Sequence, residues 1–455
     1  MLTCQLFALD YHADPAHHFE KVHAQCGAVL LDCGHPVSQR GRFDILSAWP
    51  LASITPSPAE SIDSFRQRCQ ALLKQLAVCQ APETVELPFT GGLLGYLTYE
   101  LNSLAQCTEV EGLPSATVGL YNWALISDHQ LQRCWLVCHP SMATQRQTEL
   151  TLLFSAKSAC TSTSNNIEAF QLAGPFQAQI SSERYHSDLQ RIHDYIGAGD
   201  CYQVNYTQRF SSHYQGDAWQ AYLSLRERCP TPFASFIRVN QQQAIVSLSP
   251  ERFIQVRQRQ VESRPIKGTR ARGVTMAEDQ DLANALLIST KDRAENLMIV
   301  DLLRNDLGRY CSTGSIHVPE LFTLESYPNV HHMVSSVTGT LAKKYDALDI
   351  LMGSFPGGSI TGAPKLRAMQ IIQELEASVR SIYCGSIFYL DTRGEMDSSI
   401  TIRTLLANNG EISCWGGGGI VYDSNSDDEY QESIQKVRVL MDTLESIYLP
   451  DSSSR

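Results

Sequence analysis

The sequence predicts an α+β fold in which large, mostly antiparallel sheets dominate. Two observations lead to this prediction. Short runs rich in β-branched and aromatic residues recur through the second part of the chain, and helix-length segments with apolar residues three and four positions apart separate groups of these runs. The runs cover residues 234–239, 243–248, 253–256, 385–390, 399–406 and 412–415. The first part mixes similar runs with one helix-length segment at residues 61–79.

A change in composition divides the chain near residue 175. Residues 155–179 are rich in Ser, Thr, Asn and Ala, and Pro175 follows Gly174 directly, which is typical of a surface connection. We therefore expect an N-terminal region at 1–160, a linker at 161–178 and a larger region at 179–450. We expect the two regions to pack as one body.

Composition and charge favour a protein of the cytoplasm. The 455 residues are 43% hydrophobic and 18% charged, and the formal net charge is -12. An acidic balance argues against nucleic acid and anionic membranes as main partners. The start of the chain lacks the pattern of a secretory signal, and no apolar span is long enough to cross a bilayer. The 14 cysteines include no Cys-x-x-Cys pair, so we expect reduced core thiols.

Lys267 is a candidate nucleophile because of its neighbours. It stands in the segment 264–269, between Pro265 and Gly268. Pro265 fixes its own φ and Gly268 permits a close backbone approach, so we expect the lysine to be held in one place. An exposed lysine in a turn after a strand is the alternative explanation for this pair.

Glu295 is a candidate acidic ligand in a predicted helix at 291–310, with Ser289 or Thr290 as the N-cap. The three-to-four spacing places Glu295 on a face with apolar residues, so its carboxylate points along the apolar side and needs a partner. An ion pair with Lys291, four residues earlier, is the structural alternative. The segment alone leaves both explanations open.

Glu429 and Glu432 open a predicted helix at 427–449 and lie on one face of its first turns. Ser426 followed by Glu429 fits a capping box, and acidic residues favour helix N-termini in any case. Carboxylates from this helix and the helix of Glu295, if they converged, would suit Mg²⁺, which takes a few carboxylates plus ligand oxygens and waters. The sequence alone does not show the convergence.

Two glycine-rich stretches are candidate anion sites. Residues 416–419 are four glycines after a strand, whose N–H groups can surround a carboxylate, although a hairpin or bulge is the commoner use. Residues 356–365 lead into a helix with Pro364 at an early position, which makes an anion site at a helix start. The second stretch is not a Walker loop, because the Gly-Lys-Ser/Thr order is missing.

Taken together, these segments resemble the chorismate-utilising enzyme family. The similarity is strongest over roughly the last 270 residues, through 249–253, 264–270, 294–309, 358–365, 401–404 and 428–432, and it extends more weakly to the first part through 91–101. The resemblance implies sheets packed as a sandwich with helices outside. Relatives that make anthranilate or isochorismate usually have Ala where this chain has Lys267, so the resemblance implies the branch that aminates chorismate at C4, on the way to para-aminobenzoate and folate.

The resemblance also implies a mechanism and a metal. Glu251 would act as the general acid that protonates the leaving 4-hydroxyl, and Lys267 would attack C2 to form a covalent adduct. Ammonia would then attack C4 and expel the lysine. Mg²⁺ would be held by Glu295 and Glu432 with assistance from Glu429, against the ring carboxylate.

Further substrate contacts follow from the same resemblance. These are Arg403 and Tyr389 for the enolpyruvyl carboxylate, Lys365, Gly417, Gly418 and Gly419 for the carboxylates of the ligand, His332 for the region of the leaving group, and Thr361 in the glycine-rich turn. Each has a structural alternative. Arg403 could form a cross-strand ion pair within a strand, Tyr389 and His332 could be core residues, and Lys365 could be a surface helix residue.

A partner follows from the absence of a glutaminase segment with a Gly-x-Cys-x-Gly turn. The resemblance implies that ammonia comes from a separate glutamine amidotransferase subunit in a heterodimer. Members of the family can also hold tryptophan between sheets, and the counterparts of that site here lie around 42–47 and 230–233.

Two alternatives from other classes stay open. An anthranilate or isochorismate synthase would share the fold, metal and substrate and is disfavoured by Lys267. A non-catalytic regulatory subunit that binds chorismate or tryptophan is disfavoured because Glu251, Lys267, Glu295 and Glu432 occur together.

Overall fold

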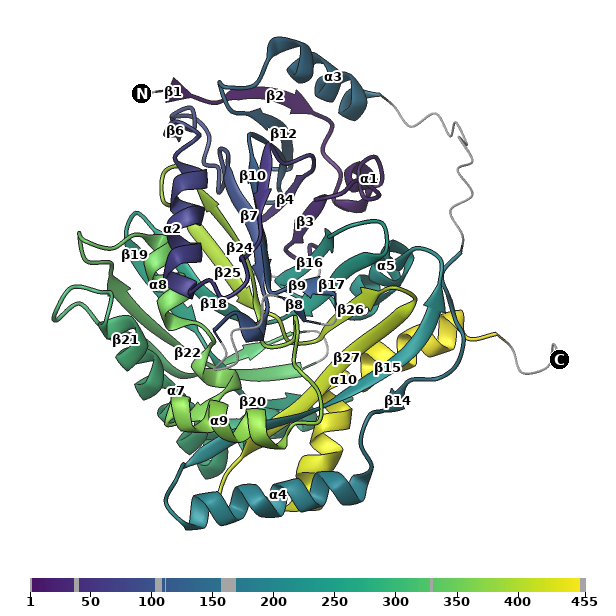
Figure 1. The fold of residues 1–455 in the computed structure, drawn as a ribbon, viewed down its shortest axis with the longest axis vertical. Helices are drawn as coiled ribbons and strands as arrows, with labels where there is room; N and C mark the ends of the chain where they lie inside the picture. The colour runs from purple at the N-terminus through teal and green to yellow at the C-terminus, as the bar shows by residue number, and fades with distance from the viewer. Residues whose placement is uncertain are drawn as a thin grey trace.

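The computed structural model describes residues 2–36, 41–102, 109–110, 112–156, 169–327 and 330–450, and two large sheets form its centre (Figure 1). The first sheet has ten described strands in the order β20 (Ile266–Ala271), β22 (Val330–Thr340), β19 (Gln260–Arg264), β18 (Arg252–Arg257), β25 (Met396–Ile400), β24 (Ser386–Asp391), β7 (Gly92–Leu97), β10 (Ala116–Tyr121) and β5 (Ala52–Ile54), with β21 (His317–Ser326) paired to β22.

The second sheet has thirteen described strands. Their order is β13 (Gln171–Leu172), β15 (Gln203–Gln215), β27 (Glu411–Ile420), β26 (Thr404–Asn408), β17 (Gln243–Ser249), β16 (Phe233–Arg238), β3 (Val29–Asp32), β4 (Phe43–Ser47), β11 (Trp123–Asp128), β12 (Arg133–Cys138) and β2 (Gln5–Leu9), with β14 (Gln177–Ala178) and β23 (Gly362–Ala363) paired to β15. Two short pairs join β1 (Leu2–Thr3) to β6 (Cys79–Gln80) and β8 (Glu109–Val110) to β9 (Leu113–Pro114). Within the described residues, every pairing in the two large sheets is antiparallel, as the sequence predicts.

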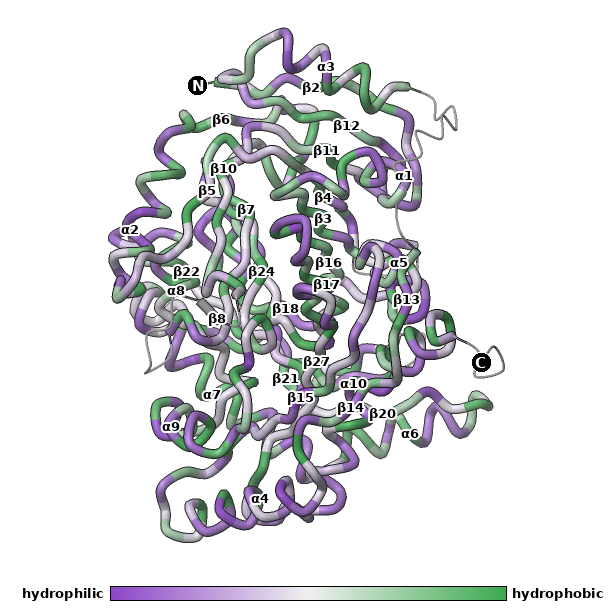
Figure 2. Tube along the Cα trace, turned by 45° about the vertical axis from the view of Figure 1, so that its right-hand side comes forward, coloured by the Kyte–Doolittle hydropathy of each residue, from purple (hydrophilic) through white to green (hydrophobic). Residues whose placement is uncertain are grey.

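Helices cover the outside of the sheets (Figure 1). They are α1 (Ala16–Phe19), α2 (Ile62–Leu73), α3 (Thr144–Ser155), α4 (Ser182–Gly197), α5 (Ala218–Arg228), α6 (Met276–Ile288), α7 (Thr290–Gly308), α8 (Ala347–Ser354), α9 (Lys365–Leu375) and α10 (Ser426–Tyr448), with single 3₁₀ turns η1 (Tyr99–Asn102) and η2 (Gly358–Ile360). In Figure 2 the strands β3, β16 and β17 are largely hydrophobic, whereas the outer helices α4 and α9 alternate between hydrophilic and hydrophobic residues. That pattern is expected where a helix buries one face only.

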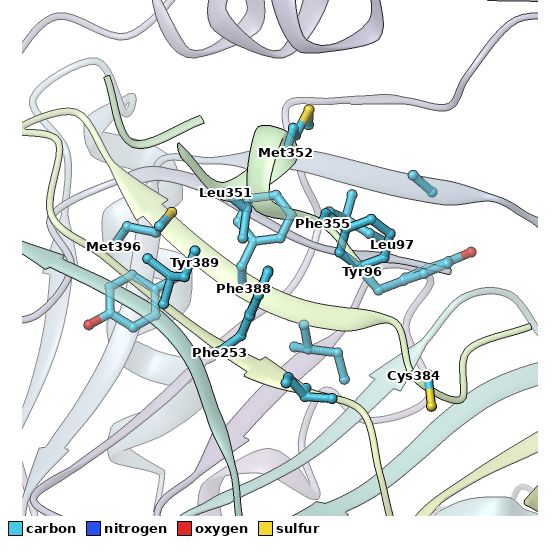
Figure 3. Packing of buried hydrophobic residues seen from close by; sticks show 14 of the residues in the cluster. Tyr96, Leu97, Phe253, Leu351, Met352, Phe355, Cys384, Phe388, Tyr389 and Met396 are labelled. Carbon is cyan, nitrogen blue, oxygen red and sulfur yellow. The ribbon is translucent and has the colours of Figure 1, made fainter. Parts of the chain in front are cut away.

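Strands from both sides of the predicted boundary share the same sheets. β7 pairs with β24 from Gly92↔Asp391 to Leu97↔Ser386, and β3 pairs with β16. The larger of two hydrophobic cores packs against the first sheet, and Figure 3 shows Phe253, Phe388 and Phe355 among its members. The first part of the predicted linker, up to residue 168, lies outside the described residues, and the rest carries β13 and β14.

The strand predicted at 399–406 is interrupted in the structure. β25 ends at Ile400 and β26 begins at Thr404, and Arg403 between them has a φ of 50°. A left-handed conformation breaks the pleat of a strand, so Arg403 belongs to a link between two strands and not to a strand interior.

The described cysteines are free thiols, and all but Cys26 are buried, in agreement with the expectation of reduced core residues. Among the described helices, none combines the length and the hydropathy needed to span a bilayer.

Candidate active site

Lys267 lies on β20 where the pairing with β22 is irregular. Ile266 pairs with Val334 and Thr269 with His332, and the register shifts between these two pairs. Gly268 has a φ of 87°, and a Cβ at this position would come within 2.8 Å of a side-chain carbon of Leu286. The bulge therefore depends on a glycine and directs the side chain of Lys267 out of the regular alternation of the strand.

A three-residue chain of hydrogen bonds joins Lys267 to Glu251. Nζ of Lys267 donates to the backbone oxygen of Ser359 at 3.0 Å, and Oγ of Ser359 donates to Oε1 of Glu251 at 2.8 Å. Ser359 belongs to η2, in the glycine-rich stretch that the sequence marks as an anion site. One short turn thus holds the candidate nucleophile and the candidate acid together.

Burial shifts the protonation of both groups toward their neutral forms. Burial raises the pKa of Glu251 to about 7, although the hydrogen bond from Ser359 and the charge of Lys267 act in the opposite direction. Burial also lowers the pKa of Lys267, and Lys436 lowers it further, while Glu295 raises it. A protonated carboxyl and a neutral amine are the forms needed for an acid and a nucleophile.

The backbone around Glu251 is fixed by its neighbours. Oγ of Ser249 accepts a hydrogen bond from the peptide nitrogen of Glu251 at 3.2 Å, and the peptide nitrogen of Ile400 donates to the carbonyl of Glu251 at 3.1 Å. Glu251 is only 4% exposed. Its carboxyl is therefore positioned before any ligand binds.

Carboxylates from α7 and α10 converge on one place. Nζ of Lys291 lies 4.0 Å from Oε1 of Glu295 on α7 and 3.7 Å from Oε1 of Glu429 on α10. A Cβ on Gly418 of β27 would lie 2.8 Å from Oε2 of Glu429 and 3.4 Å from Oε1 of Glu432. Glu429 and Glu432 thus border a space that a side chain at residue 418 would fill, and Lys291 links Glu295 to Glu429 at its edge. Below, this space is called the carboxylate cage.

The residues of the carboxylate cage fit a hard divalent ion. Burial raises the pKa of Glu295 and of Glu429, so each carboxylate gains from a nearby cation. Burial acts to raise the pKa of Glu432, but the charge and hydrogen bond of Lys436 together with the charges of Lys291 and Lys267 leave it lowered. Oxygen donors alone, several of them anionic and with room for water or ligand oxygens, are the donor set that Mg²⁺ prefers.

The capping explanation for Glu429 is wrong. α10 begins at Ser426, and its N-cap is Asn425, whose Oδ1 accepts hydrogen bonds from the peptide nitrogens of Asp427 and Asp428. Glu429 instead accepts a hydrogen bond from Oγ of Ser424 at 2.7 Å. The side chain of Glu429 is 4% exposed and its carboxylate faces Lys291. Glu429 therefore does not cap the helix.

Arg403 and His332 lie close enough to influence each other. Burial and the charge of Arg403 lower the pKa of His332 to about 3, so the imidazole is neutral at pH 7. Nδ1 of His332 is hydrogen-bonded to Oγ1 of Thr269 at 2.9 Å. Within the described part of the chain, the guanidinium of Arg403 has neither a hydrogen bond nor an ion pair, and burial lowers its pKa. A partly buried guanidinium in this state is a ready partner for an anion.

Three other predicted residues are placed differently. Nζ of Lys365 is paired with Asp306 at 2.5 Å, and Oγ1 of Thr361 donates to the backbone oxygen of Gly357 at 3.0 Å. Tyr389 lies on β24 in the wall of a separate cavity. The contacts of these three side chains do not bring them to Lys267 or to the carboxylate cage.

The glycines at 416–419 form a regular strand and not a hairpin. They pair with β15, from Gly419↔Asn205 to Gly416↔Gln208, whereas the described pairing with β26 ends at Cys414. Alternate peptide groups of an antiparallel strand point away from its partner. The open edge at Gly417, Gly418 and Gly419 therefore presents backbone groups beside the carboxylate cage.

A cavity of about 340 Å³ lies between the sheets, and sequence neighbours of Glu251 and Lys267 line it. Pro250 and Arg252 line this cavity on either side of Glu251, and Ile266 lines it next to Lys267. Neither Glu251 nor Lys267 is in its wall, so the chemistry lies on the opposite side of β18 and β20. Residues from both predicted tryptophan stretches, 42–47 and 230–233, contribute to the lining.

A second set of potential metal ligands lies in the N-terminal region and is explained without a metal. The donor atoms of Cys33, Asp44 and His129 lie within 4.8 Å of one another. However, Nε2 of His129 is hydrogen-bonded to Asp44 at 2.6 Å, and Nδ1 is hydrogen-bonded to Tyr11 at 2.8 Å. The cluster is a satisfied buried hydrogen-bond network.

Sequence reasoning missed Ser359 and Lys436. Ser359 holds Glu251 and Lys267, and Lys436 lies 2.6 Å from Oε1 of Glu432 and donates to the backbone oxygen of Gly417 at 2.9 Å. A signal existed for Lys436, because it stands four residues after Glu432 on one helix face. For Ser359 the only signal was its place in the glycine-rich stretch 356–365, which does not single out the serine.

The comparisons with known proteins agree in family and fold. Residues 37–442 match the family described as chorismate binding enzyme. The chain is 43% identical over 460 residues to aminodeoxychorismate synthase component 1 of Escherichia coli (strain K12), covering 98% of this chain and 99% of that protein. It is 34% identical over 425 residues to the protein of the same name from Bacillus subtilis (strain 168), covering 89% and 90%. The crystal structure of anthranilate synthase component I from Streptococcus pneumoniae TIGR4 superposes with a TM-score of 0.75 at 29% identity, covering 89% of this chain and 93% of that chain.

Proposed function

Because the chain belongs to the family of chorismate binding enzymes, we propose that it aminates chorismate to 4-amino-4-deoxychorismate as the chorismate-using subunit of an aminodeoxychorismate synthase. The observation that carries the proposal is the link from Lys267 through Ser359 to Glu251. The fold and the full-length relatives support the substrate, and the lysine supports the choice of product.

Glu251 and Lys267 divide the chemistry between them. Glu251, protonated below about pH 7, gives its proton to the 4-hydroxyl of chorismate, which leaves as water. The amine of Lys267 forms a bond to C2 as the ring double bonds shift and the C4–O bond breaks. Ammonia then forms a bond to C4, the double bonds shift back, and the C2–N bond to Lys267 breaks. The net change is the replacement of hydroxyl by amine at C4 with release of one water.

The carboxylate cage is proposed to hold Mg²⁺, with Glu295 and Glu432 as ligands and Glu429 assisting. The convergence around Gly418 and the all-oxygen donor set support this choice. Bound there, the ion would neutralise the ring carboxylate of chorismate and favour electron withdrawal from the ring. Without a cation between them, Glu295, Glu429 and Glu432 would repel the ring carboxylate.

Substrate anchoring is proposed for Arg403, with His332 beside it. The guanidinium has no partner among the described residues and would bind the enolpyruvyl carboxylate. The neutral imidazole of His332 would adjoin the leaving-group region. The open edge of Gly417, Gly418 and Gly419 would donate peptide hydrogen bonds to a substrate carboxylate.

Roles for Tyr389, Lys365 and Thr361 stay predictions. The ion pair between Lys365 and Asp306 would have to open before Lys365 could contact the substrate.

A second subunit is proposed to supply ammonia. Most ammonia is protonated and not nucleophilic near pH 7, and we infer that a glutamine amidotransferase releases it next to this site.

The cavity between the sheets is proposed to hold tryptophan, since residues of both predicted stretches line it and its wall is largely apolar. A cytoplasmic location stays a prediction from composition.

The test is to incubate the purified chain with chorismate, Mg²⁺ and excess ammonium at mildly alkaline pH and to identify the product by liquid chromatography and mass spectrometry. A peak of 4-amino-4-deoxychorismate that disappears without Mg²⁺ is the expected result. Anthranilate or isochorismate would favour the alternative synthases and show that Lys267 does not set the outcome. Tight calorimetric binding of chorismate without turnover would favour a regulatory subunit.

A further inference from the structure

The carboxylate cage already contains a cation that belongs to the protein. Nζ of Lys291 lies 3.7 Å from Glu429 and 4.0 Å from Glu295. A surface pair between residues four apart on one helix would explain the contact with Glu295 alone. It does not explain the contact with Glu429, which comes from α10 and is 4% exposed. The ammonium therefore neutralises a space shared by two helices.

The position of Lys291 is fixed at its base and loose at its tip. Ser289 caps α7, accepting a hydrogen bond from the peptide nitrogen of Asp292 at 3.2 Å, and Arg270 on β20 pairs with the carboxylate of Asp292 at 2.8 Å. These contacts fix the first turn of the helix. The side chain of Lys291 is nevertheless 57% exposed, and its two ionic contacts are longer than hydrogen bonds. Its ammonium can leave toward solvent at little cost.

Lys436, the other lysine of the cage, makes shorter contacts than Lys291. It lies 2.6 Å from Oε1 of Glu432 and donates to the backbone oxygen of Gly417 at 2.9 Å. These are two direct hydrogen-bonding contacts, one of them to the backbone. Of the two lysines, Lys291 is therefore the one that an incoming ion displaces more easily.

We propose that the ammonium of Lys291 is a resident counter-ion of the carboxylate cage, and that a divalent cation displaces it on binding in the cage. The proposal rests on the proposed metal site of the enzyme. Without the ion, Lys291 limits the repulsion among three carboxylates. With the ion, it becomes a competing positive charge that weakens binding. Lys291 thereby lowers the affinity for the cation and keeps the empty site stable.

The test compares the full-length chain with Lys291→Met by titrating Mg²⁺ calorimetrically and by measuring thermal unfolding in EDTA and in saturating Mg²⁺. We expect Lys291→Met to bind Mg²⁺ roughly tenfold more tightly, since one nearby positive charge is removed. We also expect a lower Tm than wild type in EDTA and a smaller difference in saturating Mg²⁺. Lys343→Met, which removes the same charge at an exposed position, serves as the control and should change neither quantity.

The outcomes separate the two proposals. If the wild-type chain binds Mg²⁺ and Lys291→Met binds it equally or more weakly, the counter-ion proposal is overturned while the metal site stands. If the wild-type chain binds no Mg²⁺, the metal site fails and the counter-ion proposal fails with it. Lys291→Gln, which keeps a polar side chain, provides the same comparison if Lys291→Met does not fold. A loss of Tm that is equal in EDTA and in Mg²⁺ would mean a structural role only.

Discussion

The hydroxyl of Ser359 donates a hydrogen bond to the carboxyl of Glu251 at 2.8 Å, and the backbone oxygen of Ser359 accepts a hydrogen bond from Nζ of Lys267 at 3.0 Å. A single residue therefore contacts the two groups that the proposed reaction requires. Because this contact lowers the pKa of Glu251, Ser359 acts as a positioning residue with an effect that can be measured.

Replacing Ser359 by Ala should slow turnover by roughly tenfold, the cost of one hydrogen bond to a reacting group. The loss of this hydrogen bond should also raise the pKa of Glu251 above its value of about 7. We expect the alkaline limb of the pH–rate profile to move to higher pH. Ser354→Ala is the matched control, since the hydroxyl of Ser354 has no hydrogen-bond partner among the described residues. A slower enzyme with an unmoved limb would contradict the positioning role.

The pH dependence of kcat/KM should be bell-shaped. Glu251 has a pKa raised to about 7, so its acidic form is present below that pH and is lost as the pH rises through it. Lys267 has a lowered pKa, and its free amine increases as the pH rises. Glu251→Gln should lower kcat by a factor of roughly 10² to 10⁴. It should also abolish the alkaline limb, and persistence of that limb would assign it to another group.

Gly418→Ala should weaken the binding of Mg²⁺ by about 10- to 100-fold, the usual cost of disturbing a metal site. The added Cβ would lie 2.8 Å from Oε2 of Glu429 and would push that carboxylate from the cage. Calorimetric titration measures the change. Gly308→Ala places a Cβ in open space and should leave the affinity unchanged. Equal affinities for all three proteins would remove Glu429 and Glu432 from the proposed site.

Arg403→Gln should raise the KM for chorismate by about 30-fold or more, because a charged partner of a buried anion is lost. Steady-state kinetics at saturating Mg²⁺ and ammonium separate this effect from a change in kcat. Arg403→Lys keeps the charge and should restore part of the affinity. A change confined to kcat would instead place Arg403 at the reacting centre.

Much of the local structure was predictable from the sequence, because its causes are local. The cap at Ser289 begins α7 as expected, and the apolar runs at 234–239 and 243–248 correspond to β16 and β17. The prediction of one continuous strand at 399–406 was wrong, because the residue pattern does not reveal the left-handed conformation of Arg403. The cap of α10 was assigned one residue late, because Ser426 and Asn425 are both good N-cap residues.

The candidate site was predictable as residue types and not as an arrangement. Glu295 and Glu429 are 134 positions apart, and only the contacts of Lys291 with both carboxylates show that they come near each other. The contact of Ser359 with Glu251 likewise joins segments with no shared pattern. Long-range pairing of this kind depends on the whole topology, which no sequence window contains.

The most direct test of the central claim is to look for the covalent adduct at Lys267. The chain is mixed with chorismate and Mg²⁺ in the absence of ammonia, quenched with acid, digested and analysed by peptide mass spectrometry. The account predicts that the peptide with Lys267 gains the mass of chorismate less one water, and that the gain disappears when ammonium is added or in Lys267→Ala. An unmodified Lys267 peptide under conditions where added ammonium gives 4-amino-4-deoxychorismate would contradict the account.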